Sequence, residues 1–280
     1  MELEAYLKRR QAIINRALGK YLPSVQELPG TIHRAMRYSV LGPGKRIRPV
    51  LVLAACEAVG GKISSVMPAA CAVELIHAYS LVHDDLPSMD NDDFRRGKPS
   101  CHKQFGEAIG ILTGDALLTY SFQLLSSGNK PAGNGSASEV RLRVIGEVAR
   151  AIGTQGMLGG QVADVEVTRR RSVKPQLLQF IHTRKTGALI AASVRVGALL
   201  GGASPKAYQA LSRYGQRVGL VFQLVDDLLD RDGVVELSGE AAVRRQAERL
   251  TRSACAALAP LGRRGQPLMG LAEFILTRES

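Results

Sequence analysis

An apolar stretch of the chain ends in the sequence His83-Asp84-Asp85-Leu86-Pro87-Ser88-Met89-Asp90, and another ends in Phe222-Gln223-Leu224-Val225-Asp226-Asp227-Leu228-Leu229-Asp230. We call the carboxylates of these segments the first aspartate cluster (Asp84, Asp85, Asp90) and the second aspartate cluster (Asp226, Asp227, Asp230). Carboxylates at the edge of an apolar helix are costly to bury unless cations neutralise them. Carboxylate oxygens suit Mg²⁺, which keeps several waters and accepts phosphate oxygens of a substrate. Two such clusters facing each other would hold several Mg²⁺ ions around one polyphosphate.

Outward from these segments, helical periodicity runs through almost the whole chain, and no segment alternates convincingly like a half-buried strand. The pattern predicts helices over residues 3–19, 29–41, 46–59, 65–85, 105–126, 139–154, 175–183, 185–201, 206–230 and 240–258. Glycines and prolines separate them, and residues 126–136 are predicted to form a loop. Because no linker is long enough to separate two cores, we expect one all-α domain over residues 1–280.

The composition favours closely packed helices and an anionic partner. Of the 280 residues 45% are hydrophobic but only 5% are aromatic, so small aliphatic residues carry the core. The net charge of +12 implies nucleic acid, a membrane surface or a phosphorylated small molecule. Basic residues are scattered, with short runs such as Arg169-Arg170-Arg171 and no interleaved aromatics, which disfavours nucleic acid.

The sequence also predicts a cytoplasmic protein with no membrane span. The cysteines lack metal-ligand spacing and are interpreted as core residues or free thiols of a reducing compartment: Cys56, Cys71, Cys101 and Cys255. The N-terminus carries charges where a signal peptide needs an apolar run. The apolar stretch over residues 187–200 is too short to cross a bilayer and contains Arg195.

Two basic segments accompany the aspartate clusters, Gly44-Lys45-Arg46-Ile47-Arg48-Pro49 and Arg95-Arg96-Gly97-Lys98-Pro99. Guanidinium groups bind phosphate oxygens in bidentate fashion, and the first segment also opens a predicted helix, whose N–H groups favour anions. This combination indicates two diphosphates, one held by Mg²⁺ and one held by cations alone. His77 precedes Asp84 by seven residues on nearly the same helix face, where a ligand and a partly buried structural residue are both open interpretations.

Together these motifs resemble the trans-isoprenyl diphosphate synthases, the polyprenyl synthetase family, and most closely its bacterial farnesyl diphosphate synthases. The resemblance covers roughly residues 30–232. It is carried by both basic segments, by both aspartate clusters with the run Glu74-Leu75-Ile76-His77-Ala78-Tyr79-Ser80-Leu81-Val82 before the first, and by Gly114-Asp115-Ala116-Leu117, Gly159-Gly160-Gln161 and Lys185-Thr186-Gly187.

The resemblance implies a role for each matching residue. It implies Mg²⁺ ligands at all six aspartates of the two clusters. It implies catalytic roles for Asp84, Asp85, Asp90, Lys185, Asp226 and Asp227. It implies a metal-free isopentenyl diphosphate site formed by Gly44, Lys45, Arg48, His77 and Arg96. It implies contacts to an allylic diphosphate from Arg95, Lys185, Thr186 and Gln223.

The implied fold is a single large helical bundle with a central cavity flanked by two aspartate-rich helix ends, and the implied assembly is a homodimer. The implied reaction ionises the allylic C–O bond, adds the cation to isopentenyl diphosphate and removes a proton, with the departing diphosphate as proton acceptor. Tyr79, five residues before Asp84, would close the channel for the growing chain, with the smaller Ser80 beside it. An aromatic residue here implies a fifteen-carbon product, farnesyl diphosphate.

The chain departs from the family after Asp230. Relatives continue through a loop with a lysine that helps bind the allylic diphosphate, whereas here no lysine follows Lys206. Either a lid element has been lost, which would weaken the exclusion of water, or this sequence lacks a loop that the natural protein has. Three alternatives stay open: a geranylgeranyl or longer-chain synthase, a non-catalytic partner subunit of the same fold, and a terpene cyclase, which would not need Lys45, Arg48 and Arg96.

Overall fold

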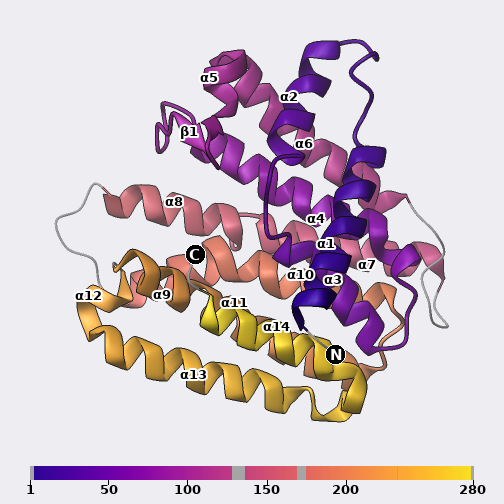
Figure 1. Ribbon diagram of the computed structural model, residues 1–280, viewed down its shortest axis with the longest axis vertical. Helices are drawn as coiled ribbons and strands as arrows, with labels where there is room; N and C mark the ends of the chain where they lie inside the picture. The colour runs from indigo at the N-terminus through magenta and orange to yellow at the C-terminus, as the bar shows by residue number, and fades with distance from the viewer. Residues whose placement is uncertain (1–2, 128–135, 169–174, 232, 279–280) are drawn as a thin grey trace. The chain divides into compact units, whose positions relative to one another are not determined.

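The computed structural model describes residues 3–127, 136–168, 175–231 and 233–278. In these residues the chain is helical apart from one short antiparallel hairpin, which confirms the prediction of an all-α protein (Figure 1). The α-helices are α1 (Leu3–Tyr21), α2 (Gly30–Val40), α3 (Ile47–Ala58), α4 (Ile63–Asp84), α5 (Cys101–Phe105), α6 (Glu107–Ser126), α7 (Ala137–Ile152), α8 (Met157–Thr168), α9 (Pro175–Ile181), α10 (Ala188–Leu200), α11 (Pro205–Asp230), α12 (Val234–Ser238), α13 (Glu240–Ala257) and α14 (Gln266–Thr277). A π-helical turn spans His182–Gly187, a 3₁₀ segment spans Ala259–Gly265, and the hairpin strands are β1 (Phe94–Arg95) and β2 (Lys98–Pro99).

The chain forms two compact units. The N-terminal unit comprises residues 4–50 and the described part of 67–129, and the C-terminal unit comprises Leu51–Val66 and the described residues from 130 onward, with Leu3. The divisions fall within α3 and α4. The expectation of a single domain stays a prediction.

In the N-terminal unit, α4 is apolar around most of its circumference, which is typical of a helix buried on all sides. Its apolar residues between Val66 and Val82 are buried except for the partly exposed Leu81, and the charged Glu74 is buried among them. Helices α2, α5 and α6 pack against one another in the same unit.

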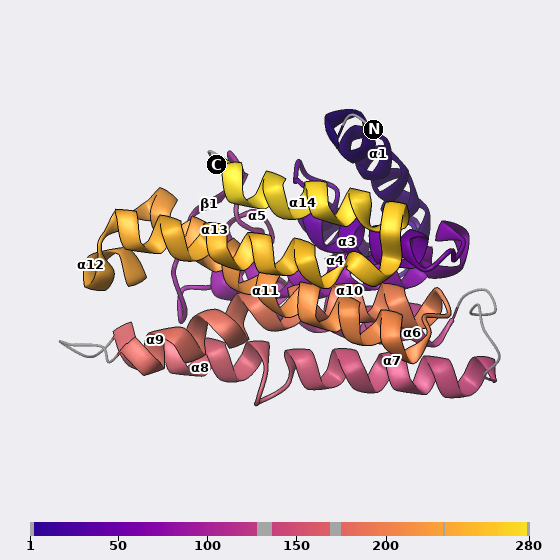
Figure 2. The same cartoon turned by 90° about the horizontal axis from the view of Figure 1, so that it is seen from below.

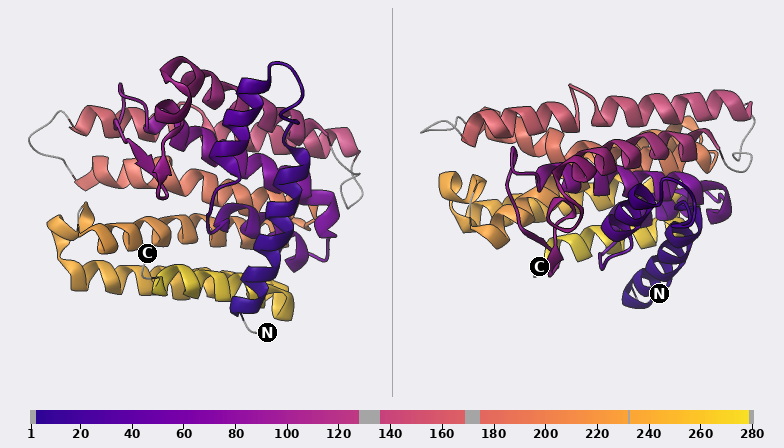
Figure 3. Two further views of the ribbon diagram at one scale, coloured as in Figure 1. Left: turned by 45° about the horizontal axis from the view of Figure 1, so that its top comes forward. Right: turned by 90° about the horizontal axis from the view of Figure 1, so that it is seen from above.

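In the C-terminal unit, α11 is the central helix. Ser204 caps its start by accepting a hydrogen bond from the Ala207 N–H (3.3 Å), and Pro205 follows at the first helical position. The nearly fully buried α10 packs against both α7 and α11 (Figure 2). Helices α13 and α14 extend alongside α11 (Figures 1 and 3).

Glycines allow several of these helices to approach closely. A Cβ atom at Gly197 of α10 would lie 2.2 Å from the Val52 carbonyl oxygen of α3, and a Cβ at Gly219 of α11 would lie 2.9 Å from Gly187. Real Cβ atoms do not tolerate such distances, so the backbones could not pack in this way with larger residues.

The structure departs from the predicted elements in several places. Helices α8 and α14 and the short α5 and α12 were not predicted, and the predicted helix over 185–201 begins instead as the π-helical turn. Helix α8 contains Gly159 and Gly160. Adjacent glycines usually predict the end of a helix, but here Gly160 permits a close contact with the backbone of Lys185. The hairpin has only two residues in each strand, too few for a visible alternation. Most of the predicted loop over 126–136, and the basic run 169–171, lie outside the described residues.

Within the part of the chain that the structure describes, two helices are long and apolar enough to cross a membrane by length and composition alone, α4 and α6. The core helix of a soluble protein passes the same test, and 72% of the most apolar window of α4 is buried. The two helices therefore do not show a membrane span, and its absence stays a prediction.

We expect a methyl group to have opposite effects on the free energy of unfolding at two helical glycines. Gly197→Ala should lower the free energy of unfolding by about 1–3 kcal/mol, because its Cβ would overlap the α3 backbone. Gly146→Ala in α7, where a Cβ meets nothing within 4 Å, should raise it by about 0.5–1 kcal/mol. Urea denaturation of both variants tests this, and equal effects would contradict the close packing of α10 on α3.

Candidate active site

The first aspartate cluster lies where α4 ends in the N-terminal unit. The helix ends at Asp84, and the chain turns back so that the Asp90 N–H donates to the Asp84 carbonyl (2.8 Å). Pro87 within the turn cannot continue the helix. The structure thus brings the predicted residues of this cluster together, with Asp85 buried and Asp90 exposed.

Arg95 of the hairpin pairs with Asp85. Its Nε donates to Asp85 Oδ1 (2.9 Å), its Nη2 contacts the same oxygen, and Nη2 also donates to Asp92 (2.9 Å). Burial raises the pKa of the Asp85 carboxyl, and Arg95 offsets part of this effect. The hairpin that carries Arg95 turns through Arg96 (φ +53°) and Gly97 (φ +75°), both in the left-handed region.

His83 connects the first aspartate cluster to α6. Its Nε2 lies 2.9 Å from the Ile111 carbonyl oxygen and 3.9 Å from Asp115 Oδ1. A Cβ at Gly114 would lie 2.0 Å from this nitrogen, so only glycine fits here. This contact gives a structural reason for the Gly114-Asp115 motif.

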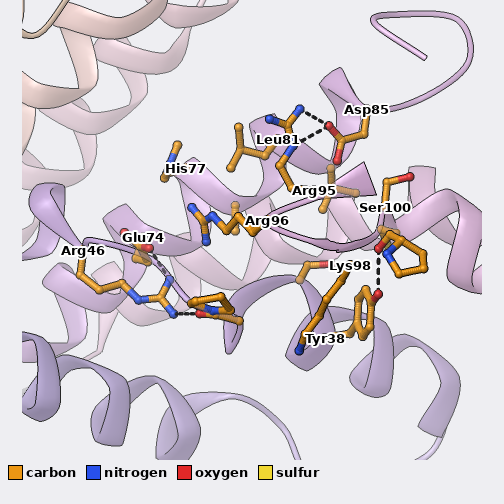
Figure 4. A pocket seen from close by; sticks show the side chains of 17 residues that line it. Tyr38, Arg46, Glu74, His77, Leu81, Asp85, Arg95, Arg96, Lys98 and Ser100 are labelled. Carbon is orange, nitrogen blue, oxygen red and sulfur yellow. Dashed lines mark hydrogen bonds and ion pairs between the residues drawn. The ribbon is translucent and has the colours of Figure 1, made fainter. Parts of the chain in front are cut away.

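A small cavity of about 50 Å³ lies beside the hairpin, wholly within the N-terminal unit (Figure 4). Its lining includes the predicted site residues His77, Arg95 and Arg96, together with Lys98. Burial and the neighbouring cations Arg48, Arg96, Arg46 and Arg95 lower the pKa of His77 well below its usual value. A neutral His77 can therefore offer a hydrogen bond without adding charge to this cationic site.

The other residues predicted to hold isopentenyl diphosphate do not line this cavity. Gly44 approaches Arg96, since a Cβ there would lie 2.9 Å from Arg96 Nη1. Lys45 is exposed and Arg48 is half-buried, and neither lines the cavity. Two buried charged residues near the cavity were not predicted as site residues, Arg46 and Glu74.

The second aspartate cluster lies at the end of α11 in the C-terminal unit. Asp227 is buried and accepts hydrogen bonds from Gln223 Nε2 (2.9 Å) and from the Val234 N–H (3.0 Å). His182 Nδ1 lies 3.6 Å from the same carboxylate. Gly233 has φ +59°, and a Cβ there would lie 2.7 Å from Asp227 Oδ2. Asp227 thus fixes the segment that follows α11.

Asp226 has a partner that the sequence did not suggest. Arg278 Nη2 donates to Asp226 Oδ1 (2.5 Å) and to the Phe222 carbonyl (2.9 Å), and its guanidinium lies 3.8 Å from the centre of the Phe222 ring. Asp226 remains 33% exposed, and Asp230 is exposed. No motif surrounds Arg278, so only the tertiary structure identifies it.

Lys185 projects from the π-helical turn and is paired with Asp164 of α8 (Nζ to Oδ2, 2.6 Å). Helix α8 can approach the π-helical turn this closely because residue 160 is a glycine. A Cβ atom there would lie only 2.3 Å from the Lys185 backbone nitrogen. The Gly159-Gly160-Gln161 motif therefore serves to bring Asp164 to Lys185. Thr186 follows Lys185 in the same turn and is half-buried.

Tyr79 lies buried on α4, five residues before Asp84. Burial, with a smaller contribution from Asp84, raises the pKa of its hydroxyl to about 12. Its ring packs edge-on against His83 at a centroid distance of 5.8 Å, and its buried hydroxyl has no hydrogen-bond partner among the described residues. The neighbouring Ser80 hydroxyl donates to the His77 carbonyl (2.9 Å).

The donor set of both clusters fits Mg²⁺. All donors are carboxylate oxygens, but the described residues contain no group of three or more His, Cys, Asp or Glu arranged to hold a metal. Mg²⁺ is commonly bound by one or two carboxylates together with water and substrate phosphates, rather than by a complete protein cage. Asp85 and Asp227 are buried, so the more exposed aspartates are those best able to meet a metal: Asp84, Asp90, Asp230 and Asp226, which would first have to release Arg278.

Comparison with known proteins identifies the family of this chain. Residues 29–248 match the family model described as "Polyprenyl synthetase". The chain is 42% identical to a "Dimethylallyltranstransferase" of Fischerella ambigua over 99% of this chain and 84% of that one. It is also 42% identical to a chloroplastic "Geranylgeranyl pyrophosphate synthase" of Capsicum annuum over 98% of this chain and 78% of that one.

Among solved structures, an "FPP/GFPP synthase" from Zymomonas mobilis superposes with a TM-score of 0.91 at 34% identity, covering 98% of this chain and 99% of that one. FPP denotes farnesyl diphosphate. Similarity in sequence and in structure thus extends over nearly the whole chain. The chain belongs to the polyprenyl synthetase family and is a prenyltransferase, a trans-prenyl diphosphate synthase.

Proposed function

We propose that this prenyltransferase depends on Mg²⁺ and condenses isopentenyl diphosphate with dimethylallyl or geranyl diphosphate, giving farnesyl diphosphate and diphosphate. The observation that carries the product assignment is Tyr79, a large side chain buried on α4 about 7.5 Å of helical rise below Asp84. A ring in this position would stop a growing prenyl chain. The second candidate product, geranylgeranyl diphosphate, is supported by the name of the Capsicum annuum relative.

The proposed site uses the residues expected from the sequence. The six aspartates of the two clusters face Mg²⁺ and the allylic diphosphate, with Asp84, Asp90, Asp226 and Asp230 as the more accessible donors. Arg95, Lys185, Thr186 and Gln223 contact the allylic diphosphate. Gly44, Lys45, Arg48, His77 and Arg96 hold isopentenyl diphosphate without metal.

In the proposed mechanism the protein binds and orients two diphosphates and excludes water. Bound Mg²⁺ supplies positive charge that stabilises the departing diphosphate. Arg95 and Lys185 turn from their carboxylate partners, Asp85 and Asp164, toward phosphate oxygens. Before substrate binds, burial and the neighbouring arginines lower the pKa of His77, so it enters the reaction neutral and can form a hydrogen bond beside Arg96. The departing diphosphate accepts the proton, so no side chain acts as general base.

An assay with the purified protein tests this function. The protein is incubated with Mg²⁺, isopentenyl diphosphate and an allylic diphosphate, and the dephosphorylated products are separated by chromatography. A fifteen-carbon alcohol supports the proposal, and a twenty-carbon alcohol supports the second candidate. A cyclic hydrocarbon or no product at all would contradict both. The cytoplasmic location and the homodimer stay predictions from the sequence.

Replacing one aspartate of either cluster should stop turnover without unfolding the protein. Asp84→Ala and Asp226→Ala each remove a partly exposed carboxylate at a helix end. Asp226→Ala also removes the partner of the nearly buried Arg278 guanidinium, so it should lower the melting temperature more than Asp84→Ala does. We expect kcat to fall at least about 100-fold, equivalent to about 2.7 kcal/mol. Circular dichroism melting checks the fold, and Glu248→Ala on the surface of α13 serves as control. Near-normal turnover by either aspartate variant would contradict the metal assignment.

The two diphosphate sites should separate in steady-state kinetics. Arg48→Ala and Arg96→Ala should chiefly raise the KM for isopentenyl diphosphate, and Lys185→Ala should chiefly raise the KM for the allylic substrate. Each variant removes a charge-assisted contact of about 1.5–3 kcal/mol, which corresponds to roughly 10- to 150-fold in KM. The reverse pattern would mean that the two sites are exchanged.

Tyr79→Ala should lengthen the product to twenty carbons or more, because it removes the ring that closes the proposed channel. The same change leaves a cavity and should lower the free energy of unfolding by about 3 kcal/mol or more, so products are measured well below the melting temperature. Tyr120→Ala, a half-buried tyrosine of α6, is the matched control and should leave product length unchanged. A fifteen-carbon product from Tyr79→Ala would show that another residue sets the length.

A further inference from the structure

Arg46 and Glu74 form an ion pair that is almost completely buried beside the cationic cavity (Figure 4). The Nη1–Oε1 distance is 2.6 Å, and the side chains are 2% and 4% exposed. Arg46 also has φ +56°, in the left-handed region that residues with a side chain rarely adopt. A buried charge in an unfavourable backbone conformation needs strong local compensation, which its other hydrogen bonds provide.

The guanidinium of Arg46 binds the backbone on both sides of the turn that precedes it. Its Nη2 donates to the carbonyls of Val40 (2.7 Å) and Gly42 (2.7 Å), and its Nε donates to Asn15 Oδ1 of α1 (2.9 Å). Glu74 holds the remaining nitrogen. One side chain thus ties the end of α2, the turn, α1 and α4 together.

A second side chain of α1 completes this arrangement. Gln11 Nε2 donates to the Gly44 carbonyl (2.6 Å), so the carbonyls of residues 40, 42 and 44 are all bound by side chains. The space at Gly44 is taken by two guanidinium groups, because a Cβ there would lie 2.9 Å from Arg96 Nη1 and 3.3 Å from Arg46 Nη1. Arg96 therefore lies against the part of the turn whose backbone Arg46 and Gln11 hold in place.

We infer that Arg46 and Glu74 are a positioning pair, which fixes the turn over residues 41–45 and Arg96 in the arrangement that receives isopentenyl diphosphate. This inference rests on the isopentenyl diphosphate site proposed above. Both side chains line the cavity but are almost completely buried and bonded to the protein, so the role assigned to them is positioning and not substrate contact. Arg46 holds the backbone beside Gly44 and Lys45 through its hydrogen bonds. Glu74 neutralises the charge of Arg46, so the buried pair carries no net charge.

The competing explanation is that the pair only stabilises the fold. Replacing a buried ion pair with apolar residues of similar volume is often neutral or stabilising, whereas removing one partner is strongly destabilising. The double variant Arg46→Met with Glu74→Leu therefore separates the two roles. It removes both buried charges at once. It also removes the hydrogen bonds that Arg46 donates to the carbonyls of Val40 and Gly42.

Isopentenyl diphosphate binding is measured by calorimetry without Mg²⁺, with the melting temperature of each variant beside it. Glu74→Gln should melt earlier than the unmodified protein. The double variant has no unpaired buried charge and should melt above Glu74→Gln, but below the unmodified protein because the Val40 and Gly42 carbonyls lose their donor. Its Kd for isopentenyl diphosphate should rise at least tenfold. Its KM for the allylic substrate should stay within about twofold. The matched control replaces the largely buried pair Arg195 and Glu147 of the C-terminal unit in the same way and should leave this Kd unchanged.

The outcomes are distinct. If Arg48→Ala leaves the Kd unchanged, the proposed isopentenyl diphosphate site is wrong. If Arg48→Ala weakens binding but the stable double variant binds normally, the positioning role is overturned. If the double variant does not fold, two single variants of α1 test the inference in its place. Asn15→Ala removes the hydrogen bond from Arg46, and Gln11→Ala removes the hydrogen bond to the Gly44 carbonyl. A rise of at least twofold in Kd supports the inference, and unchanged binding in both variants overturns it.

Discussion

A carboxylate buried at the end of an apolar helix requires a cation or hydrogen-bond donors, and this requirement organises the surroundings of both aspartate clusters. Asp85 obtains a guanidinium from the hairpin that follows α4, and Asp227 obtains a side-chain amide and a backbone N–H from the segment that follows α11. In each case the chain beyond the helix is held to the helix end. The aspartates next to them, Asp84 and Asp226, keep partial exposure and are accessible to a ligand.

The motifs of the sequence acquire physical reasons from close backbone contacts. Gly114 leaves room for His83, Gly160 for the Lys185 backbone, and Gly44 for Arg96. In each instance the missing Cβ leaves room for a neighbouring group, the side chain of His83 or Arg96 or the backbone of Lys185. The glycine motifs of this chain therefore lie where the backbone makes close contacts with these residues.

Much of the fold could be predicted from the sequence because helical periodicity and the two aspartate clusters are local signals. The partners of the site residues could not, because they lie far away along the chain: Asp164 is 21 residues from Lys185, Glu74 is 28 residues from Arg46, and Arg278 is 52 residues from Asp226. Helix α8 was missed for a related reason. Its glycines weaken the helical pattern locally, and only packing against the π-helical turn compensates for this.

The pairing of Arg95 with Asp85 and of Lys185 with Asp164 makes the proposed binding of substrate an exchange of partners. A monovalent anion gains little by displacing a carboxylate of equal charge. A polyphosphate that arrives with divalent cations gains more, since the cation compensates the carboxylate that the arginine or lysine releases. Metal and diphosphate would then each raise the affinity for the other by the same factor, as thermodynamic linkage requires. The resting ion pairs would thus act as a filter that favours complete metal–diphosphate complexes over the simple anions of the surrounding solution.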